Sequence, residues 1–242
     1  MSMAIRGVLF DKDGTLIAFR DTWIPTYRRA AADLALLAGE PDLGPRLLRA
    51  TGYDPDTDEL APSSPLARGT NAEIAALWAR QSPTLAALPD LGQRVDALFH
   101  ELAVALSQPI VPLDRLFANL RRRGLRLGVA TADAELTARA TFDRFGVSDQ
   151  LDAVYGYDSG HAAKPAPDKL LAFARLTGLA PGEIAVVGDA VSDLEMARSG
   201  GAGRAIGVLS GVAGRADLAH VADLLLDSVA DLESALFPFG NP

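Results

Sequence analysis

Cysteine is absent from the 242 residues, which excludes disulfide bonds, thiolate metal ligands and a cysteine nucleophile. Histidine occurs three times, as His100, His161 and His220, and these positions are too scattered to suggest a zinc site. Basic residues are not in excess: 31 acidic against 23 basic residues give a formal charge of −8, which argues against binding nucleic acid or anionic membranes. The apolar run near the N-terminus is too short for a signal peptide or a membrane span. We therefore expect a cytoplasmic protein that must meet any anion with local positive groups.

Apolar residues make up 49% of the chain, enough for one substantial core or for a core with a smaller appended domain. After Pro112, short strand patterns alternate with helix patterns, which predicts crossover units and a parallel sheet covered on both faces. The predicted strands are residues 5–10, 125–130, 153–157, 184–187, 205–209 and, with a weaker pattern, 224–226.

The first two predicted strands are separated by residues 19–108, where helical patterns prevail and no convincing strand occurs. Thr70 and Glu73 have the spacing of a capping box, and the proline-rich residues 54–69 predict a loop. This connection is far too long for one crossover helix. We therefore expect an inserted all-helical domain at residues 19–108 and an α/β core formed by residues 1–18 and 109–242.

Polar side chains follow four of the predicted strands: Asp11 and Asp13, then Thr131, then Lys164, then Asp189 with Asp193. Each has an ordinary structural explanation, as an acidic turn, a helix cap, a surface lysine or an acid in a first helical turn. Ligands of such folds, however, bind at the carboxyl ends of the strands. Paired carboxylates there suit a hard divalent cation, above all Mg²⁺.

The order of these residues resembles the signatures of the haloacid dehalogenase-like hydrolase superfamily, especially its phosphoglycolate phosphatase-like branch. The matching positions are Asp11, Asp13, Gly14, Thr15 and Leu16, then Thr131, then Lys164 and Asp168 with the intervening prolines, then Gly188, Asp189 and Asp193. The resemblance covers nearly the whole chain. It implies a Rossmann-like parallel core, with the insertion at residues 19–108 as a helical cap.

The resemblance also implies a phosphatase mechanism. Asp11 would attack phosphorus and form an aspartyl phosphate, which splits one hard displacement into two. Asp13 would protonate the leaving oxygen and then take a proton from water. Thr131 would donate a hydrogen bond to a phosphoryl oxygen, and Lys164 would supply positive charge to the transferring group.

The implied cofactor is Mg²⁺, held by Asp11, the backbone carbonyl of Asp13 and Asp189. Asp193 would orient Lys164 or a metal-bound water. The substrate-binding positions implied by the resemblance are Gly14, Thr15, Thr131, Ala132 and Lys164.

Lys12 departs from the family pattern, because an apolar residue usually stands between the two acids; we expect its side chain to point away from the nucleophile with little effect. Asp13 favours phosphoryl transfer over dehalogenation, since dehalogenases of this fold lack that acid and need no metal. A sugar-phosphate mutase would keep the same core and differ in how the cap excludes water. A non-catalytic phosphate-binding module is a further alternative.

The expected partner is a small phosphorylated metabolite, with phosphoglycolate first and sugar phosphates next, and the chain is expected to be a monomer or a homodimer. Candidate substrate contacts in the insertion are Arg20, Trp23, Tyr27, Arg28, Tyr53, Arg68 and Asn71, although packing or a solvated surface explains most of them better than a substrate contact does.

Overall fold

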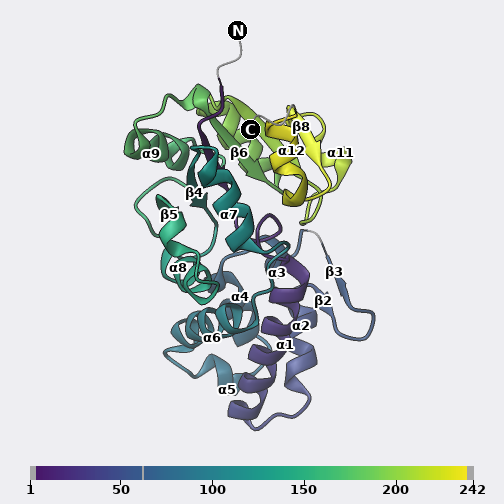
Figure 1. Ribbon diagram of the computed structural model, residues 1–242. Coiled ribbons are helices and arrows are strands. Elements are labelled where there is room, and N and C mark those ends of the chain that lie inside the picture. Colours follow the sequence, from purple (N-terminus) through teal and green to yellow (C-terminus); the bar gives the residue numbers. More distant parts are fainter. Residues whose placement is uncertain (1–3, 62, 239–242) are drawn as a thin grey trace. The chain divides into compact units, whose positions relative to one another are not determined.

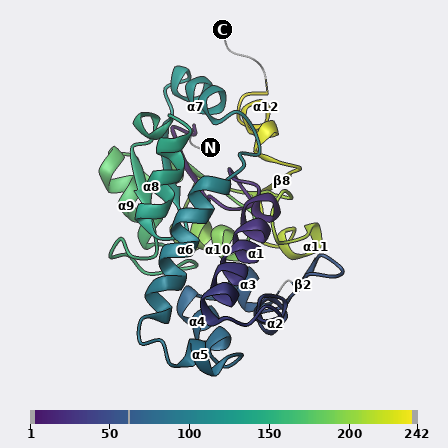
Figure 2. The ribbon, with the colours of Figure 1, turned by 90° about the horizontal axis from the view of Figure 1, so that it is seen from below.

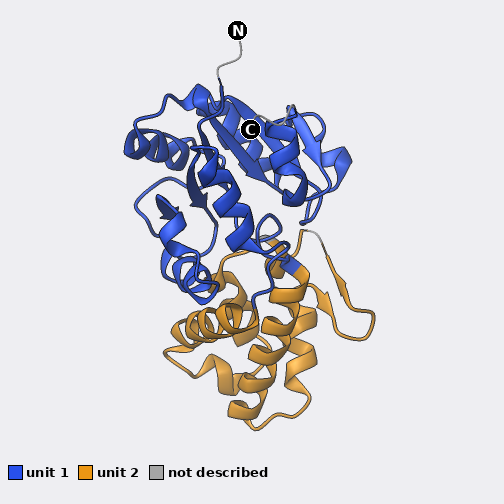
Figure 3. Cartoon of the chain, viewed as in Figure 1, with its two compact units in different colours: residues 1–19, 107–242 blue, residues 20–106 orange. Residues whose placement is uncertain are grey.

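Two compact units make up the chain in the computed structural model, which describes residues 4–61 and 63–238. The first unit comprises residues 1–19 and 107–242, and the second comprises residues 20–106 (Figure 3). These limits lie beside the predicted ones at residues 18 and 109, and the role of the second unit as a cap stays a prediction. In the described ranges, no helix combines the length and the apolar character that crossing a membrane requires.

A six-stranded, fully parallel sheet forms the centre of the first unit, in the order β5-β4-β1-β6-β7-β8. The strands are β1 (Gly7–Phe10), β4 (Arg126–Ala130), β5 (Ala153–Tyr155), β6 (Ile184–Gly188), β7 (Arg204–Val208) and β8 (Leu224–Leu226). The prediction of a parallel α/β sheet is confirmed. In the central strands, Phe10 pairs with Val129 of β4 and with Val187 of β6, so the carboxyl ends of the three strands are aligned.

Helices cover both faces of this sheet (Figures 1 and 2). They are α7 (Leu113–Arg122), α8 (Glu135–Arg144), α9 (Asp168–Thr177), α10 (Val191–Ser199), α11 (Arg215–Leu218) and α12 (Leu232–Leu236), with 3₁₀ turns η1 (Ser148–Gln150), η2 (Pro181–Glu183) and η3 (Val229–Asp231). Val8 and Phe10 pack in one core with α7, α8 and α12, whereas Leu9 packs in the other with α9, α10 and α11. Neither face of a strand buried on both sides contacts solvent, so polar residues do not alternate with apolar ones. This explains the continuous apolar run of β1.

The second unit is mainly helical. Its helices are α1 (Phe19–Ala38), α2 (Leu43–Ala50), α3 (Pro65–Arg68), α4 (Asn71–Ala79), α5 (Pro83–Ala86) and α6 (Leu91–Leu106). An aromatic cluster joins α1, α4 and α6: the ring centroids of Trp23 and Tyr27 lie 5.4 Å apart, and those of Trp78 and Phe99 lie 5.7 Å apart. The predicted capping box at the start of α4 is present, with Thr70 accepting from the Glu73 amide.

A short hairpin departs from the predicted all-helical insertion. Strand β2 (Tyr53–Asp54) pairs antiparallel with β3 (Glu59–Leu60), within and beside the stretch predicted as a loop. Two residues per strand are too few to produce an alternating pattern that sequence reasoning could detect. Asp58 turns the chain with a φ of +58°, which is uncommon for a residue other than glycine. The prediction of an insertion without strands is therefore wrong at this hairpin.

Candidate active site

Lys164 links two of the predicted site residues. Its ammonium lies 2.7 Å from Asp11 Oδ1 and 2.5 Å from Asp193 Oδ1, and it donates to the Ala130 carbonyl over 3.3 Å. The side chains of Lys164, Asp11 and Asp193 are no more than 8% exposed. Burial acts to lower the pKa of Lys164, but Asp11 and Asp193 outweigh it and raise the pKa, so the ammonium stays charged. The ion pairs confirm that these groups, distant in sequence, meet at one edge of the sheet.

Three carboxylates gather beside this lysine. Ligand oxygens of Asp11, Asp189 and Asp193 all lie within 4.8 Å of one another. Burial and the neighbouring Asp11 raise the pKa of Asp189 well above its ordinary value. Burial likewise raises the pKa of Asp193 to about 6, against the opposing effect of Lys164. Three buried acids beside one ammonium leave an excess of negative charge, and such an oxygen donor set fits a hard divalent cation.

Asp189 is held closely by the loops that follow β1 and β7. The amide of Val212 donates to its Oδ2 over 2.9 Å, and the hydroxyl of Thr15 donates to its Oδ1 over 3.4 Å. A Cβ added at Gly14 would lie 2.5 Å from Asp189 Oδ2, and one added at Gly211 would lie 1.9 Å from it. Both loops therefore pass the carboxylate at a distance that only glycine permits.

The side chain of Asp13 belongs to a separate ion-pair group. Lys12 Nζ lies 2.9 Å from Asp13 Oδ2 and 2.9 Å from Asp133 Oδ2, and the Lys12 side chain is only 1% exposed. Burial raises the pKa of Asp13 to about 6, with Lys12 acting in the opposite direction. Lys12 thus contacts Asp13 and Asp133 rather than Asp11, and its effect on activity stays a prediction. Sequence reasoning missed Asp133. The only feature that could have pointed to this acid is its position two residues after Thr131.

Thr131 stands at the end of β4 with its backbone fixed on both sides. Its amide donates to the Tyr155 carbonyl over 2.9 Å, and its carbonyl accepts from Lys169 Nζ over 2.7 Å. Its buried hydroxyl accepts a hydrogen bond from the Asp133 amide over 3.1 Å, while the neighbouring Ala132 is exposed. Burial, followed by the charge of Lys164, lowers the pKa of Lys169 to about 8. Lys169 was also missed, because nothing in the sequence separates it from a surface lysine.

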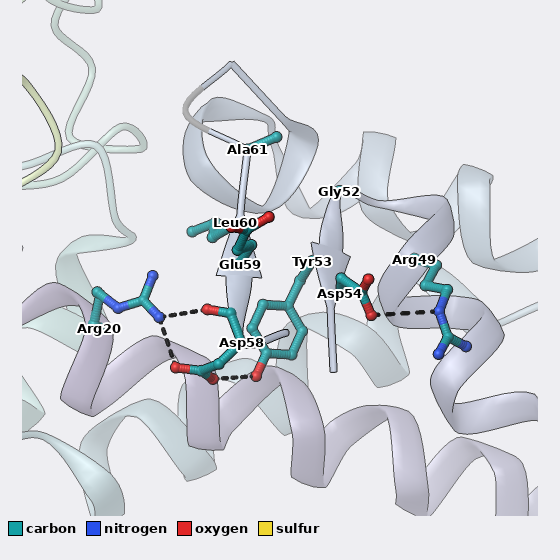
Figure 4. A pocket seen from close by; sticks show the side chains of 9 residues that line it. All are labelled: Arg20, Arg49, Gly52, Tyr53, Asp54, Asp58, Glu59, Leu60 and Ala61. Atoms are coloured by element: carbon teal, nitrogen blue, oxygen red, sulfur yellow. Dashed lines mark hydrogen bonds and ion pairs between the residues drawn. The ribbon is translucent and has the colours of Figure 1, made fainter. Parts of the chain in front are cut away.

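The second unit contains a pocket of about 620 Å³ beside its hairpin (Figure 4). Arg20 donates to Asp58 Oδ2 over 2.8 Å, and the Tyr53 hydroxyl donates to Asp58 Oδ1 over 2.6 Å. Arg28 Nε donates to the Tyr53 oxygen over 2.7 Å. Arg49, on the other side of the pocket, lies 3.5 Å from Asp54. The arginines are thus paired with acids of the hairpin, and three of the predicted contact residues, Arg20, Arg28 and Tyr53, form one network.

Three of the remaining candidate contacts of the insertion have structural partners. Trp23 and Tyr27 belong to the buried aromatic cluster, which agrees with a packing role for these two residues. The amide of Asn71 donates to Asp96 Oδ1 over 2.8 Å. The side chain of Arg68 lies outside the described part of the chain.

Comparisons with known proteins identify a family and a set of relatives. Residues 5–201 match the family described as haloacid dehalogenase-like hydrolase. The chain is 27% identical over 230 residues to a phosphoglycolate phosphatase of Pectobacterium atrosepticum, covering 95% of this chain and 91% of that protein. It is also 27% identical over 199 residues to an N-acetylmuramic acid 6-phosphate phosphatase of Pseudomonas aeruginosa, covering 82% and 80%. Among solved structures, CbbY from Rhodobacter sphaeroides in complex with phosphate is 25% identical, with a TM-score of 0.64 over 94% of this chain and 96% of that one.

Proposed function

This chain belongs to the haloacid dehalogenase-like hydrolase family, and from that premise we propose that it hydrolyses phosphate monoesters of small metabolites with the help of Mg²⁺. The observation that carries the proposal is the cluster of Asp11, Asp189 and Asp193 around Lys164 at the aligned ends of β1, β4 and β6. A carboxylate nucleophile, a fixed ammonium and an acidic cation site are what phosphoryl transfer through a covalent intermediate needs.

Asp11 is the proposed nucleophile. Lys164 engages one of its carboxylate oxygens, Oδ1, so Oδ2 is the attacking atom. Attack of Oδ2 on phosphorus forms an aspartyl phosphate and breaks the bond to the leaving oxygen. Water then attacks phosphorus, releases inorganic phosphate and restores the carboxylate. This order divides a very slow hydrolysis into two faster displacements.

Asp13 is the proposed general acid and base. Its pKa of about 6 lets it hold a proton for the leaving oxygen, and then accept one from the attacking water, near neutral pH. Thr131 and Lys164 are proposed to bind the phosphoryl oxygens, with Gly14, Thr15 and Ala132 beside the substrate. The backbone hydrogen bonds of Thr131 hold the residue in place, which supports a role in binding a phosphoryl oxygen that requires accurate positioning.

The residues proposed to hold Mg²⁺ are Asp11, Asp189 and the backbone carbonyl of Asp13. Asp193 is better suited to positioning Lys164, because its Oδ1 accepts from that ammonium and its Oδ2 accepts from the Ala190 amide over 3.0 Å. When bound, the cation would offset the repulsion between the Asp11 carboxylate and the anionic phosphate.

The second unit is proposed to act as a cap that selects the leaving group. Its proposed contacts are Arg20 and Tyr53, which line the pocket, and Arg28, which donates to the Tyr53 oxygen. Phosphoglycolate is the first candidate substrate and sugar phosphates are the next, since the relatives named above carry both kinds of name.

A turnover screen tests the proposal. Phosphoglycolate, N-acetylmuramic acid 6-phosphate and sugar phosphates are incubated with enzyme and Mg²⁺, beside Asp11→Asn as the control. Phosphate release by the wild type alone is the expected result. No release from any substrate refutes the enzyme assignment, and conversion of a sugar 1-phosphate to its 6-phosphate identifies a mutase instead.

A further inference from the structure

We propose that Lys12 is a positioning residue: its buried ammonium, held between Asp13 and Asp133, fixes the Asp13 carboxylate for proton transfer to the leaving group. The inference rests on the proposed function, because it assumes that Asp13 is the general acid. It adds two residues, Lys12 and Asp133, that act on the reaction through Asp13 and do not themselves touch the substrate.

The first argument is the geometry of the ion pairs. Lys12 Nζ lies 2.9 Å from one oxygen of each acid, and the side chain is 1% exposed while those of Asp13 and Asp133 are 16% and 13% exposed. Removing an ammonium from water is costly unless its partners are well placed. The Lys12 ammonium lies between two acids of different loops, and both acids fix its position.

The second argument is that Asp133 is rigidly attached. Its Oδ1 accepts from the Ala134 amide over 2.8 Å, its own amide donates to the Thr131 hydroxyl over 3.1 Å, and its carbonyl accepts from the Tyr157 amide over 2.9 Å. These bonds anchor one end of the Asp13–Lys12–Asp133 chain to the carboxyl end of β4. Lys12 therefore ties the loop after β1 to the loop after β4.

The third argument concerns the other oxygen of Asp13. Lys12 engages Oδ2, whereas Oδ1 is buried and has no hydrogen-bond partner among the described residues. A buried carboxylate oxygen without a partner is costly, and it marks the atom that a proton or a ligand group would satisfy. With Oδ2 tied to Lys12, Oδ1 is the oxygen of Asp13 that has no fixed partner in the described part of the chain.

Leaving-group dependence separates this role from a purely structural one. Hydrolysis of an alkyl phosphate needs a proton on the leaving oxygen, whereas p-nitrophenyl phosphate releases a stabilised phenolate that needs none. A misplaced general acid therefore slows the first substrate selectively, and general acid catalysis is typically worth about 10²–10⁴-fold. A loosened fold slows both substrates equally.

The experiment measures kcat/KM, which reports the first displacement and not the later hydrolysis of the aspartyl phosphate, for the alkyl ester β-glycerophosphate and for p-nitrophenyl phosphate with Mg²⁺. We expect Lys12→Met to lower kcat/KM about 100-fold for the alkyl ester and no more than a few-fold for the nitrophenyl ester. Because Asp13 also serves the second displacement, kcat itself falls for both esters wherever that step limits turnover. Lys12→Arg should recover part of the loss. Asp133→Asn, which preserves side-chain size and spares the buried lysine, should show the same selectivity if Lys12→Met does not fold. Asp143→Asn, on the exposed side of α8, is the matched control and should leave both rates unchanged.

Equal losses of kcat/KM for the two esters in both variants would overturn the role of Lys12. If the wild type hydrolyses neither ester, nor any substrate of the turnover screen, the proposed function fails instead. The two failures are thus distinguishable.

Discussion

Substitution of Gly211 by alanine tests whether the position of Asp189 matters as the structure requires. The added Cβ would lie 1.9 Å from Asp189 Oδ2 and 2.2 Å from its Cγ, whereas ordinary contacts begin at 3.4 Å. The carboxylate or the loop must therefore move by about 1.5 Å. Misplacement of a catalytic group by about 1 Å can cost about 100-fold in rate, so we expect kcat to fall by at least that factor. The concentration of Mg²⁺ that gives half-maximal activity should rise as well.

The stability cost of the same change is smaller. Overpacking of a well-packed site costs about 1–3 kcal/mol, and each kcal/mol shifts the Tm of a chain of this size by about 2–4 °C. We therefore expect a Tm between about 2 and 12 °C lower, with a cooperative transition retained. Gly214→Ala in the same loop is the control, because its nearest contact would be an ordinary 3.6 Å.

The assay is release of nitrophenolate from p-nitrophenyl phosphate during a Mg²⁺ titration, with melting curves recorded beside it. Wild-type kcat and Mg²⁺ dependence in Gly211→Ala would refute the argument that the close approach of this loop holds Asp189 in place. Equal loss in Gly214→Ala would show that the loop, and not the contact with Asp189, is responsible.

Four further results are expected. Lys164→Met should abolish activity and destabilise the protein in EDTA by about 3–5 kcal/mol, because Asp11 and Asp193 lose their buried counter-ion; calorimetry should show a smaller loss in Mg²⁺. Mg²⁺ at about 100 times its Kd should stabilise the wild type by about 2.7 kcal/mol, and Asp189→Asn should remove most of the resulting Tm shift. In EDTA the Tm should rise as the pH falls from about 7 to about 5. The pKa values of Asp13 and Asp193 are about 6, above the ordinary 3.8, so in this range the folded chain binds protons that the unfolded chain does not. A flat or falling Tm between about pH 7 and about pH 5 would contradict this prediction. Tyr53→Phe removes a hydroxyl bonded to Arg28 and Asp58 and should cost about 1 kcal/mol in thermal unfolding, which an unchanged Tm would contradict.

The sheet could be predicted because its strands are buried on both faces, which leaves continuous apolar runs such as Val8 to Phe10. The convergence of Asp11, Lys164 and Asp189 could be expected because parallel strands place their carboxyl ends at one edge, and the register of β1 with β4 and β6 bears this out. Both inferences use short-range patterns together with a general rule of topology.

The features that were missed depend on contacts between distant residues. Lys12 and Asp133 are far apart in the sequence, and no local pattern indicates that the lysine beside Asp11 will be buried between two acids. Lys169 has the same explanation, since its burial follows from the packing of α9 against β4. The hairpin at Tyr53 was missed because side-chain bonds to Arg28 and Asp58, rather than strand propensity, accompany its two-residue strands.

The central claim is that Asp11 becomes covalently phosphorylated during turnover. The most direct measurement is rapid acid quenching of the enzyme with ³²P-labelled substrate, followed by proteolysis and mass spectrometry of the labelled peptide. The account predicts a hydroxylamine-sensitive phosphoryl group on Asp11 that disappears in a chase with unlabelled substrate and is absent from Asp11→Asn. Turnover with no labelled protein, or a label on another residue, would contradict it.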